Sequence, residues 1–127
     1  MSNYIFELEP ATCAVKKNEI EAFAKAIKEA VSDSRWDHYG WKPNIMKAKD
    51  LYDIAKEFDI ELIDEGDGTL RPYFNSTYQS GFFEDLTKIA APFMTDGEIF
   101  INNEYSDIRI EYLNGELQPL EYREPNL

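Results

Sequence analysis

Alternating apolar and polar residues predict strands at the start of the chain and through most of its second half. Tyr4, Phe6 and Leu8 recur with a period of two, which is typical of a half-buried strand. Asn114-Gly115 is the strongest turn signal in the chain and predicts a type I′ hairpin. The predicted strands span residues 4–8, 58–62, 69–74, 98–102, 108–112 and 116–122.

Apolar residues spaced three and four positions apart predict three helices between these strands. Asn18 followed by Glu21 is similar to a capping box before the first helix. Asn44 is expected to cap the second helix, and Ser80 the third. The predicted helices span residues 19–32, 45–58 and 82–93.

The resulting order of elements is β-α-α-β-β-α-β-β-β, which predicts an α+β fold in a single domain of residues 1–127. Strands joined by short turns pair antiparallel, and the helices are expected to cover one face of the sheet. The other face is left to solvent or to a partner. Pro72 indicates an edge position for its strand, because proline has no N–H to donate to a neighbouring strand.

The composition is that of one globular domain that folds without disulfides or metal. The chain has 127 residues, of which 43% are hydrophobic and 14% aromatic, enough for a sizeable core. One cysteine cannot form an internal disulfide. No stretch approaches the length of a membrane span, and the first residues lack the pattern of a signal peptide. We therefore expect a cytoplasmic protein that makes no membrane contact.

The charge of the chain is strongly negative and unevenly placed. The net charge is −12, yet acids and bases balance over residues 1–56. The whole excess of acids lies after that point, where the only basic residues are Arg71, Lys88, Arg109 and Arg123. A field of one sign repels nucleic acids and membrane surfaces and attracts basic surfaces.

The residues offer little for catalysis or metal binding. The only histidine, His38, and the only cysteine, Cys13, permit a Cys–His pair, but no flanking motif supports one. Cys13 lies in an apolar stretch, where a buried inert thiol is the usual state. The acidic turn at residues 64–68 lacks the order of acids found in a calcium loop. We therefore expect no enzyme, no metal and no cofactor.

The aromatic loop at residues 35–41 is open to two interpretations. Tryptophan and tyrosine are frequent in binding hot spots, but they also fill gaps between helices and sheets. For this loop the core interpretation is favoured. The candidate aromatic anchors for a partner are Trp36, Tyr73 and Tyr78.

The acidic residues of the later strands and turns are the main candidates for partner contacts. Successive side chains on one face of a strand are about 6.6 Å apart, so an ordered row of carboxylates fits a groove built for phosphates. The alternative is a solvated face that keeps the protein soluble. The candidate residues are Asp59, Glu61, Asp64, Glu65, Asp67, Glu98, Glu104, Asp107, Glu111 and Glu116.

Two resemblances bear on this interpretation. The helix at residues 83–93, the Asp96-Gly97 turn and the hairpin at residues 107–117 are similar to the C-terminal helix-plus-hairpin of small acidic bacterial and phage proteins. In size, charge and lack of catalytic motifs, the chain also resembles phage-borne inhibitors of host defence, such as anti-CRISPR and anti-restriction proteins. That resemblance implies a non-catalytic inhibitor that mimics DNA, and it carries over no particular residue.

The first functional hypothesis is a protein that binds the basic surface of a nucleic-acid-binding protein and inhibits it, without contacting nucleic acid itself. The second is an immunity protein or antitoxin that neutralises a basic nuclease toxin encoded nearby. The third is a small ligand-binding domain or enzyme, which would need a concave apolar pocket with a few convergent polar groups. A housekeeping subunit that is acidic for solubility is the fourth. A homodimer formed through the open sheet face is compatible with each of these four hypotheses.

Overall fold

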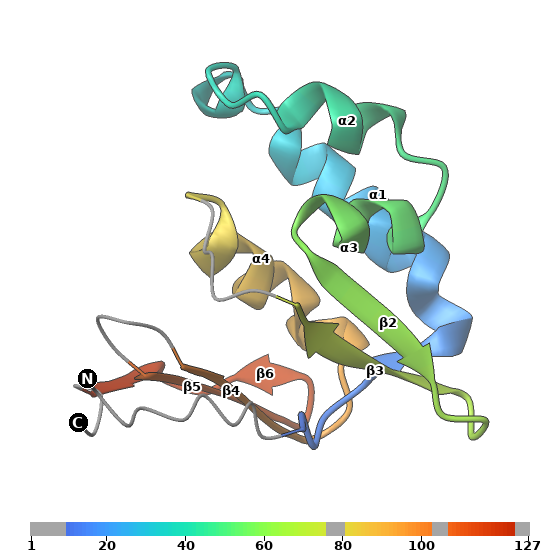
Figure 1. Cartoon of the computed structure of the whole chain (residues 1–127), viewed down its shortest axis with the longest axis vertical. Helices are drawn as coiled ribbons and strands as arrows, with labels where there is room; N and C mark the ends of the chain where they lie inside the picture. Colours follow the sequence, from blue (N-terminus) through green and yellow to red (C-terminus); the bar gives the residue numbers. More distant parts are fainter. Residues whose placement is uncertain (1–9, 76–80, 103–106, 124–127) are drawn as a thin grey trace.

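The computed structural model of the chain describes residues 10–75, 81–102 and 107–123. These residues form an α+β fold with two antiparallel sheets, as the sequence predicts for the class (Figure 1). The strands are β1 (Val15–Lys16), β2 (Ile60–Asp64), β3 (Thr69–Phe74), β4 (Gly97–Asn102), β5 (Asp107–Leu113), β6 (Glu116–Leu117) and β7 (Glu121–Arg123). The helices are α1 (Ile20–Val31), α2 (Lys42–Lys47), α3 (Leu51–Glu57) and α4 (Phe83–Ala90).

The strands divide into two sheets rather than the single sheet that was predicted. One has the order β1-β3-β2, and the other has the order β4-β5-β6, with β7 also paired to β5. The strand predicted at residues 116–122 is divided into β6 and β7 around Pro119. Proline has no N–H, so it interrupts the row of hydrogen bonds between neighbouring strands. At the predicted hairpin turn, Asn114 and Gly115 both have positive φ angles, 53° and 76°, which confirms a type I′ geometry.

A short backbone segment, residues 11–16, joins the two sheets (blue in Figure 1). The Thr12 N–H donates to the Glu98 carbonyl (2.9 Å), and the Thr95 N–H donates to the Ala14 carbonyl (2.8 Å). Val15 then pairs with Leu70 of β3. We call residues 11–16 the seam, because its first half bonds to the start of the β4 sheet and its second half to the β3 sheet. The strand predicted at residues 4–8 lies outside the described residues.

The predicted helix caps are not formed where the structure describes them. The N-cap of α1 is Glu19, with no side-chain hydrogen bond, so the Asn18 and Glu21 pair is not a capping box. The helix predicted at residues 45–58 is two helices, because Ala48 is extended and the Asp50 carboxylate accepts from the Asp53 N–H (3.0 Å) to start α3. Asn44 lies inside α2 instead of capping it. Ser80 lies outside the described residues.

The pairing of β2 with β3 explains how Pro72 fits inside a sheet. Hydrogen bonds from the Glu65 N–H to Thr69 and from the Asn75 N–H to Asp59 place the odd-numbered residues in hydrogen-bonded pairs. Pro72, opposite Leu62, therefore turns its nitrogen away from β2. The edge prediction for β3 is wrong, because β3 is the middle strand. However, β1 reaches only Thr69 and Leu70, so no strand needs a donor from Pro72.

The core lies between the helices and the inner faces of both sheets. Ile27 of α1, Ile54 of α3, Leu70 of β3 and Ile110 of β5 are almost completely buried. In β5 the alternate residues Ile108, Ile110 and Tyr112 face this core, as the predicted alternation requires. The outer faces of the sheets are left for solvent or for a partner.

Replacing Gly97 with alanine tests the seam. Gly97 has a φ of 146°, and an added Cβ would lie 2.6 Å from the Cys13 nitrogen and from the Thr12 carbonyl carbon. Because these are backbone atoms of the seam, we expect Gly97→Ala to lower the free energy of unfolding by about 2 kcal/mol or more. Gly40→Ala is the matched control, since no atom lies within 4 Å of its added Cβ. Urea unfolding that finds equal stabilities for both variants would contradict the seam geometry.

Candidate binding surface

The outer face of the β4-β5-β7 sheet carries a cluster of carboxylates around Arg109. The Arg109 guanidinium donates to both Glu98 carboxylate oxygens (2.9 Å each) and to Glu121 (3.1 Å), and its nearest approach to Glu111 is 3.5 Å. Strand pairing dictates this arrangement, because Glu98 lies opposite Glu111, and Arg109 lies opposite Glu121. The hydrogen bonds from Arg109 hold the pKa of Glu98 below its ordinary value. Glu98 and Glu111 are thus brought together but are partly neutralised.

The acids of the β2-β3 turn are also engaged within the protein. Lys17 pairs with Asp64 (2.6 Å), and Arg71 pairs with Glu65. The Lys17 ammonium lowers the pKa of Asp64 through its hydrogen bond. These two predicted contact residues remain at the surface, but each already has a cationic partner. The Arg71 and Glu65 pair spans the β2-β3 turn, and the Lys17 and Asp64 pair ties the residue after β1 to the end of β2.

Four of the predicted acids are exposed and form no salt bridge within the described residues. Asp59 immediately precedes β2, Glu61 lies in β2, Asp67 lies in the turn, and Glu116 lies in β6. Asp67 accepts hydrogen bonds from its neighbour Thr69, which lower the pKa of its carboxyl group. These four carboxylates are the acids most available to a partner.

Several predicted contact residues do not belong to this surface. Trp36 is buried and packs edge-on against Phe82, with 5.0 Å between the ring centroids, so the core interpretation holds for its ring. Asp107, the first residue of the central strand β5, is buried as well. Tyr73 is 42% exposed and stays a candidate. Glu104 and Tyr78 lie outside the described residues.

The uneven charge of the sequence becomes a separation of charge in space. Most described lysines lie on or beside α1, α2 and α3, whereas the sheets carry most of the acidic excess. Sequence position alone could not establish this, because it does not say which elements share a layer. The lysines of the helical layer are Lys25, Lys28, Lys42, Lys47, Lys49 and Lys56.

The possible Cys–His pair is not formed. Residues 10–16, with Cys13, lie at the bottom of Figure 1, and residues 34–41, with His38, lie at the top. Cys13 is 1% exposed, and burial raises the pKa of its thiol to about 12. Within the described residues, no group of three or more histidine, cysteine, aspartate or glutamate side chains could hold a metal ion.

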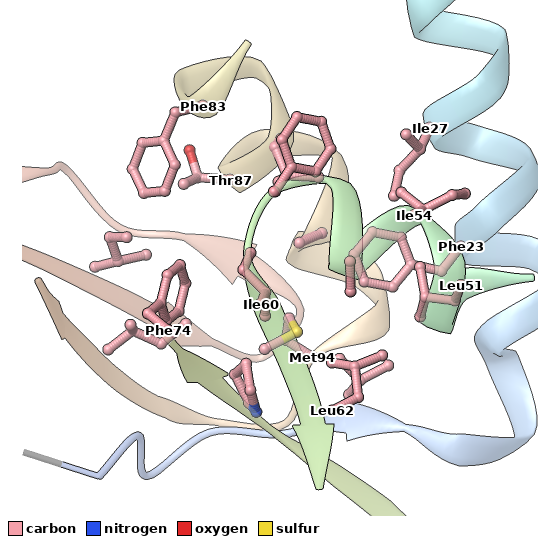
Figure 2. A pocket seen from close by; sticks show the side chains of 18 of the residues that line it. Phe23, Ile27, Leu51, Ile54, Ile60, Leu62, Phe74, Phe83, Thr87 and Met94 are labelled. Atoms are coloured by element: carbon pink, nitrogen blue, oxygen red, sulfur yellow. The ribbon is translucent and has the colours of Figure 1, made fainter. Parts of the chain in front are cut away.

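An apolar cavity of about 80 Å³ lies where the helices meet both sheets (Figure 2). Ile60 and Leu62 of β2 line one side of it, and Phe83 of α4 lines another. The lining hydroxyls of Thr87 and Tyr112 are both donated to backbone carbonyls, at 2.6 and 2.8 Å. The lining therefore lacks the convergent polar groups that a small-molecule enzyme site requires. The sequence could not predict this cavity, because it results from how three layers pack.

No protein-family model matches the chain, and no curated protein or solved structure matches it either. In the described part of the chain, no helix combines the length and apolar character needed to cross a membrane. The function must therefore be argued from the residues of this surface.

The burial of Cys13 predicts an unreactive thiol. At neutral pH the thiol stays protonated and shielded, and the thiolate is the reactive form. We expect a thiol-labelling reagent to modify Cys13 only as fast as the protein unfolds, and immediately in denaturant. Rapid labelling of the folded protein, followed by mass spectrometry, would contradict this burial.

The Glu98 and Arg109 pair predicts a specific loss of stability in acid. Because the pKa of folded Glu98 is lowered, its contribution is present at neutral pH and is lost as the pH falls below about 4.5. We expect Glu98→Gln to lower stability at pH 7 and to flatten the decline between about pH 5 and 3 in thermal unfolding. Glu116→Gln, which removes an exposed acid without a described ion pair, should keep the wild-type slope.

Proposed function

We propose that this chain is a non-catalytic binding protein whose acidic sheet layer docks on the basic surface of a nucleic-acid-handling protein and inhibits it. The observation that carries the proposal is the exposed set Asp59, Glu61, Asp67 and Glu116. These acids have no described salt bridge, and they lie on or beside the strands of the two sheets. Exposed acids on α1, such as Glu21, also have no described salt bridge, but they lie among lysines, whereas these four acids lie where acids outnumber bases.

The separation of charge supports a directed approach to such a partner. A molecule that is acidic on its sheets and nearly neutral on its helices has one favoured orientation in the field of a basic surface. Complementary fields of this kind raise association rates and suppress wrong partners more than they add affinity. The surface that a nucleic-acid-binding protein presents to phosphates is strongly basic. Occupying it would exclude the nucleic acid.

The two outer faces approach each other beside the seam, which allows a partner to contact both. A hollow of about 50 Å³ is lined by Arg71 and Tyr73 of β3 together with Phe100 of β4. Tyr73 is exposed, and an amphipathic aromatic ring surrounded by charges is typical of an interface anchor. In this proposal the acids supply orientation, and Tyr73 supplies apolar contact.

Two double variants with the same change in net charge test the proposal. Asp59→Lys with Glu61→Lys reverses the sheet layer, and Glu21→Lys with Glu29→Lys reverses exposed acids on α1. Each tagged protein is used to capture partners from a bacterial lysate at low salt, and the partners are eluted with salt steps and then with DNA.

We expect the wild type and the α1 variant to retain the same nucleic-acid-binding proteins, released by DNA, and the sheet variant to retain at least about tenfold less. Circular dichroism confirms that each variant is folded. The proposal would be contradicted if both variants captured equal amounts of these proteins. It would also be contradicted if neither salt nor DNA eluted the captured proteins.

A further inference from the structure

The backbone of β2 has one edge that no described strand occupies. β2 pairs with β3 alone in the described part of the chain. Since the odd-numbered residues hydrogen-bond to β3, the N–H and C=O groups of Ile60, Leu62 and Asp64 turn to the other edge. An edge of this kind is a template on which another strand can pair.

The inner side of that edge borders the apolar cavity. Ile60 and Leu62 are half-buried and line the cavity together with Phe74 of β3 and Phe83 of α4 (Figure 2). A strand added beside β2 would place alternate side chains on the same side as Ile60 and Leu62. Apolar side chains suit those positions, because no lining group offers an unpaired polar atom.

The outer side of the same strand begins with an acid, Glu61, and continues two residues later with the half-buried Ile63. Glu61 projects from the opposite face of β2, and Asp59 immediately precedes the strand, with a φ of 60°. Both are exposed and form no salt bridge within the described residues. The alternate side chains of an added strand would meet these carboxylates, which favours lysine or arginine there.

We infer that the partner docks by adding an extended segment, in which apolar and basic residues alternate, to the free edge of β2. The inference rests on the proposed function and specifies how the basic partner is recognised. Backbone hydrogen bonds to Ile60, Leu62 and Asp64 give the register, the cavity side selects apolar residues, and Glu61 selects basic ones. A second copy of this chain fits poorly, because antiparallel pairing of two β2 strands would gather the acids of both copies.

A titration with two peptides of the same composition tests this mode of docking. In one peptide lysine and valine alternate, and in the other the lysines and valines form separate blocks. We expect the alternating peptide to bind at least about tenfold more tightly, because only it matches both sides of β2. In hydrogen-exchange NMR, the amides of Ile60, Leu62 and Asp64 should be unprotected in the free protein and protected in the complex.

Two changes locate the contact. Methylating the peptide amides that face β2 should weaken binding about tenfold or more, since it removes backbone donors without changing charge. Glu61→Lys should weaken binding of the alternating peptide severalfold more than Glu21→Lys, its matched control on α1.

Three results would overturn the inference. If both peptides bound equally and in a salt-dependent way, without protecting the β2 amides from hydrogen exchange, the docking site would be the acidic surface. Strand addition would then be wrong. If neither peptide bound at low salt, the result would contradict the proposed function as well as strand addition. Concentration-dependent dimerisation that protects the same amides without peptide would show that a second copy occupies the edge.

Discussion

Backbone hydrogen bonds from the seam, residues 11–16, connect two sheets that do not pair with each other directly. Thr12 and Ala14 bond to the start of the β4 sheet, and Val15 pairs with β3. Without these bonds the β2-β3 pair would be a two-stranded ribbon, which is at best marginally stable in water. The burial of Cys13 and the requirement for glycine at position 97 both follow from how closely this segment packs. The six residues of the seam therefore hold the two sheets together as one unit.

Helix α4 attaches this layer to the rest of the core. The Tyr112 hydroxyl in β5 donates to the Thr87 carbonyl (2.8 Å), and Arg35 pairs with Asp85 on the same helix. The helix thus contacts the inner face of one sheet and the aromatic loop of the helical layer. Residues of this helix and of both sheets line the apolar cavity, which borders the free edge of β2. The architecture that leaves this space also leaves the edge and its acids accessible.

Features of the fold set by local sequence could be predicted, and features set by distant contacts could not. The hairpin at Asn114-Gly115 and the strand at residues 69–74 follow from turn chemistry and alternation. β1 has only two residues, too few to show any period. The break before α3 was missed because the helical spacing of apolar residues continues through it, and only the Asp50 cap marks the new start.

The same distinction applies to the candidate surface. The sequence located the acidic excess, but it could not separate paired from unpaired acids, since the partners lie far apart in the chain. Lys17 is 47 residues from Asp64 in the chain, and Arg109 is 11 residues from Glu98. Trp36 shows the opposite difficulty, because a tryptophan in a polar loop is typical of both a hot spot and a core. Only its contact with Phe82 assigns it to the core.

The central claim is that the seam makes the two sheets one cooperative body that presents the acids together. Native-state hydrogen exchange of the Thr12 and Thr95 amides tests it most directly, compared with Arg71 of β3, which pairs with β2, and with Ile110 in β5. The account predicts that all four amides exchange only through global unfolding, with the same free energy of opening. If Thr12 and Thr95 exchange at much lower free energy while Arg71 and Ile110 stay protected, the sheets are held together by the helices alone and the claim is wrong.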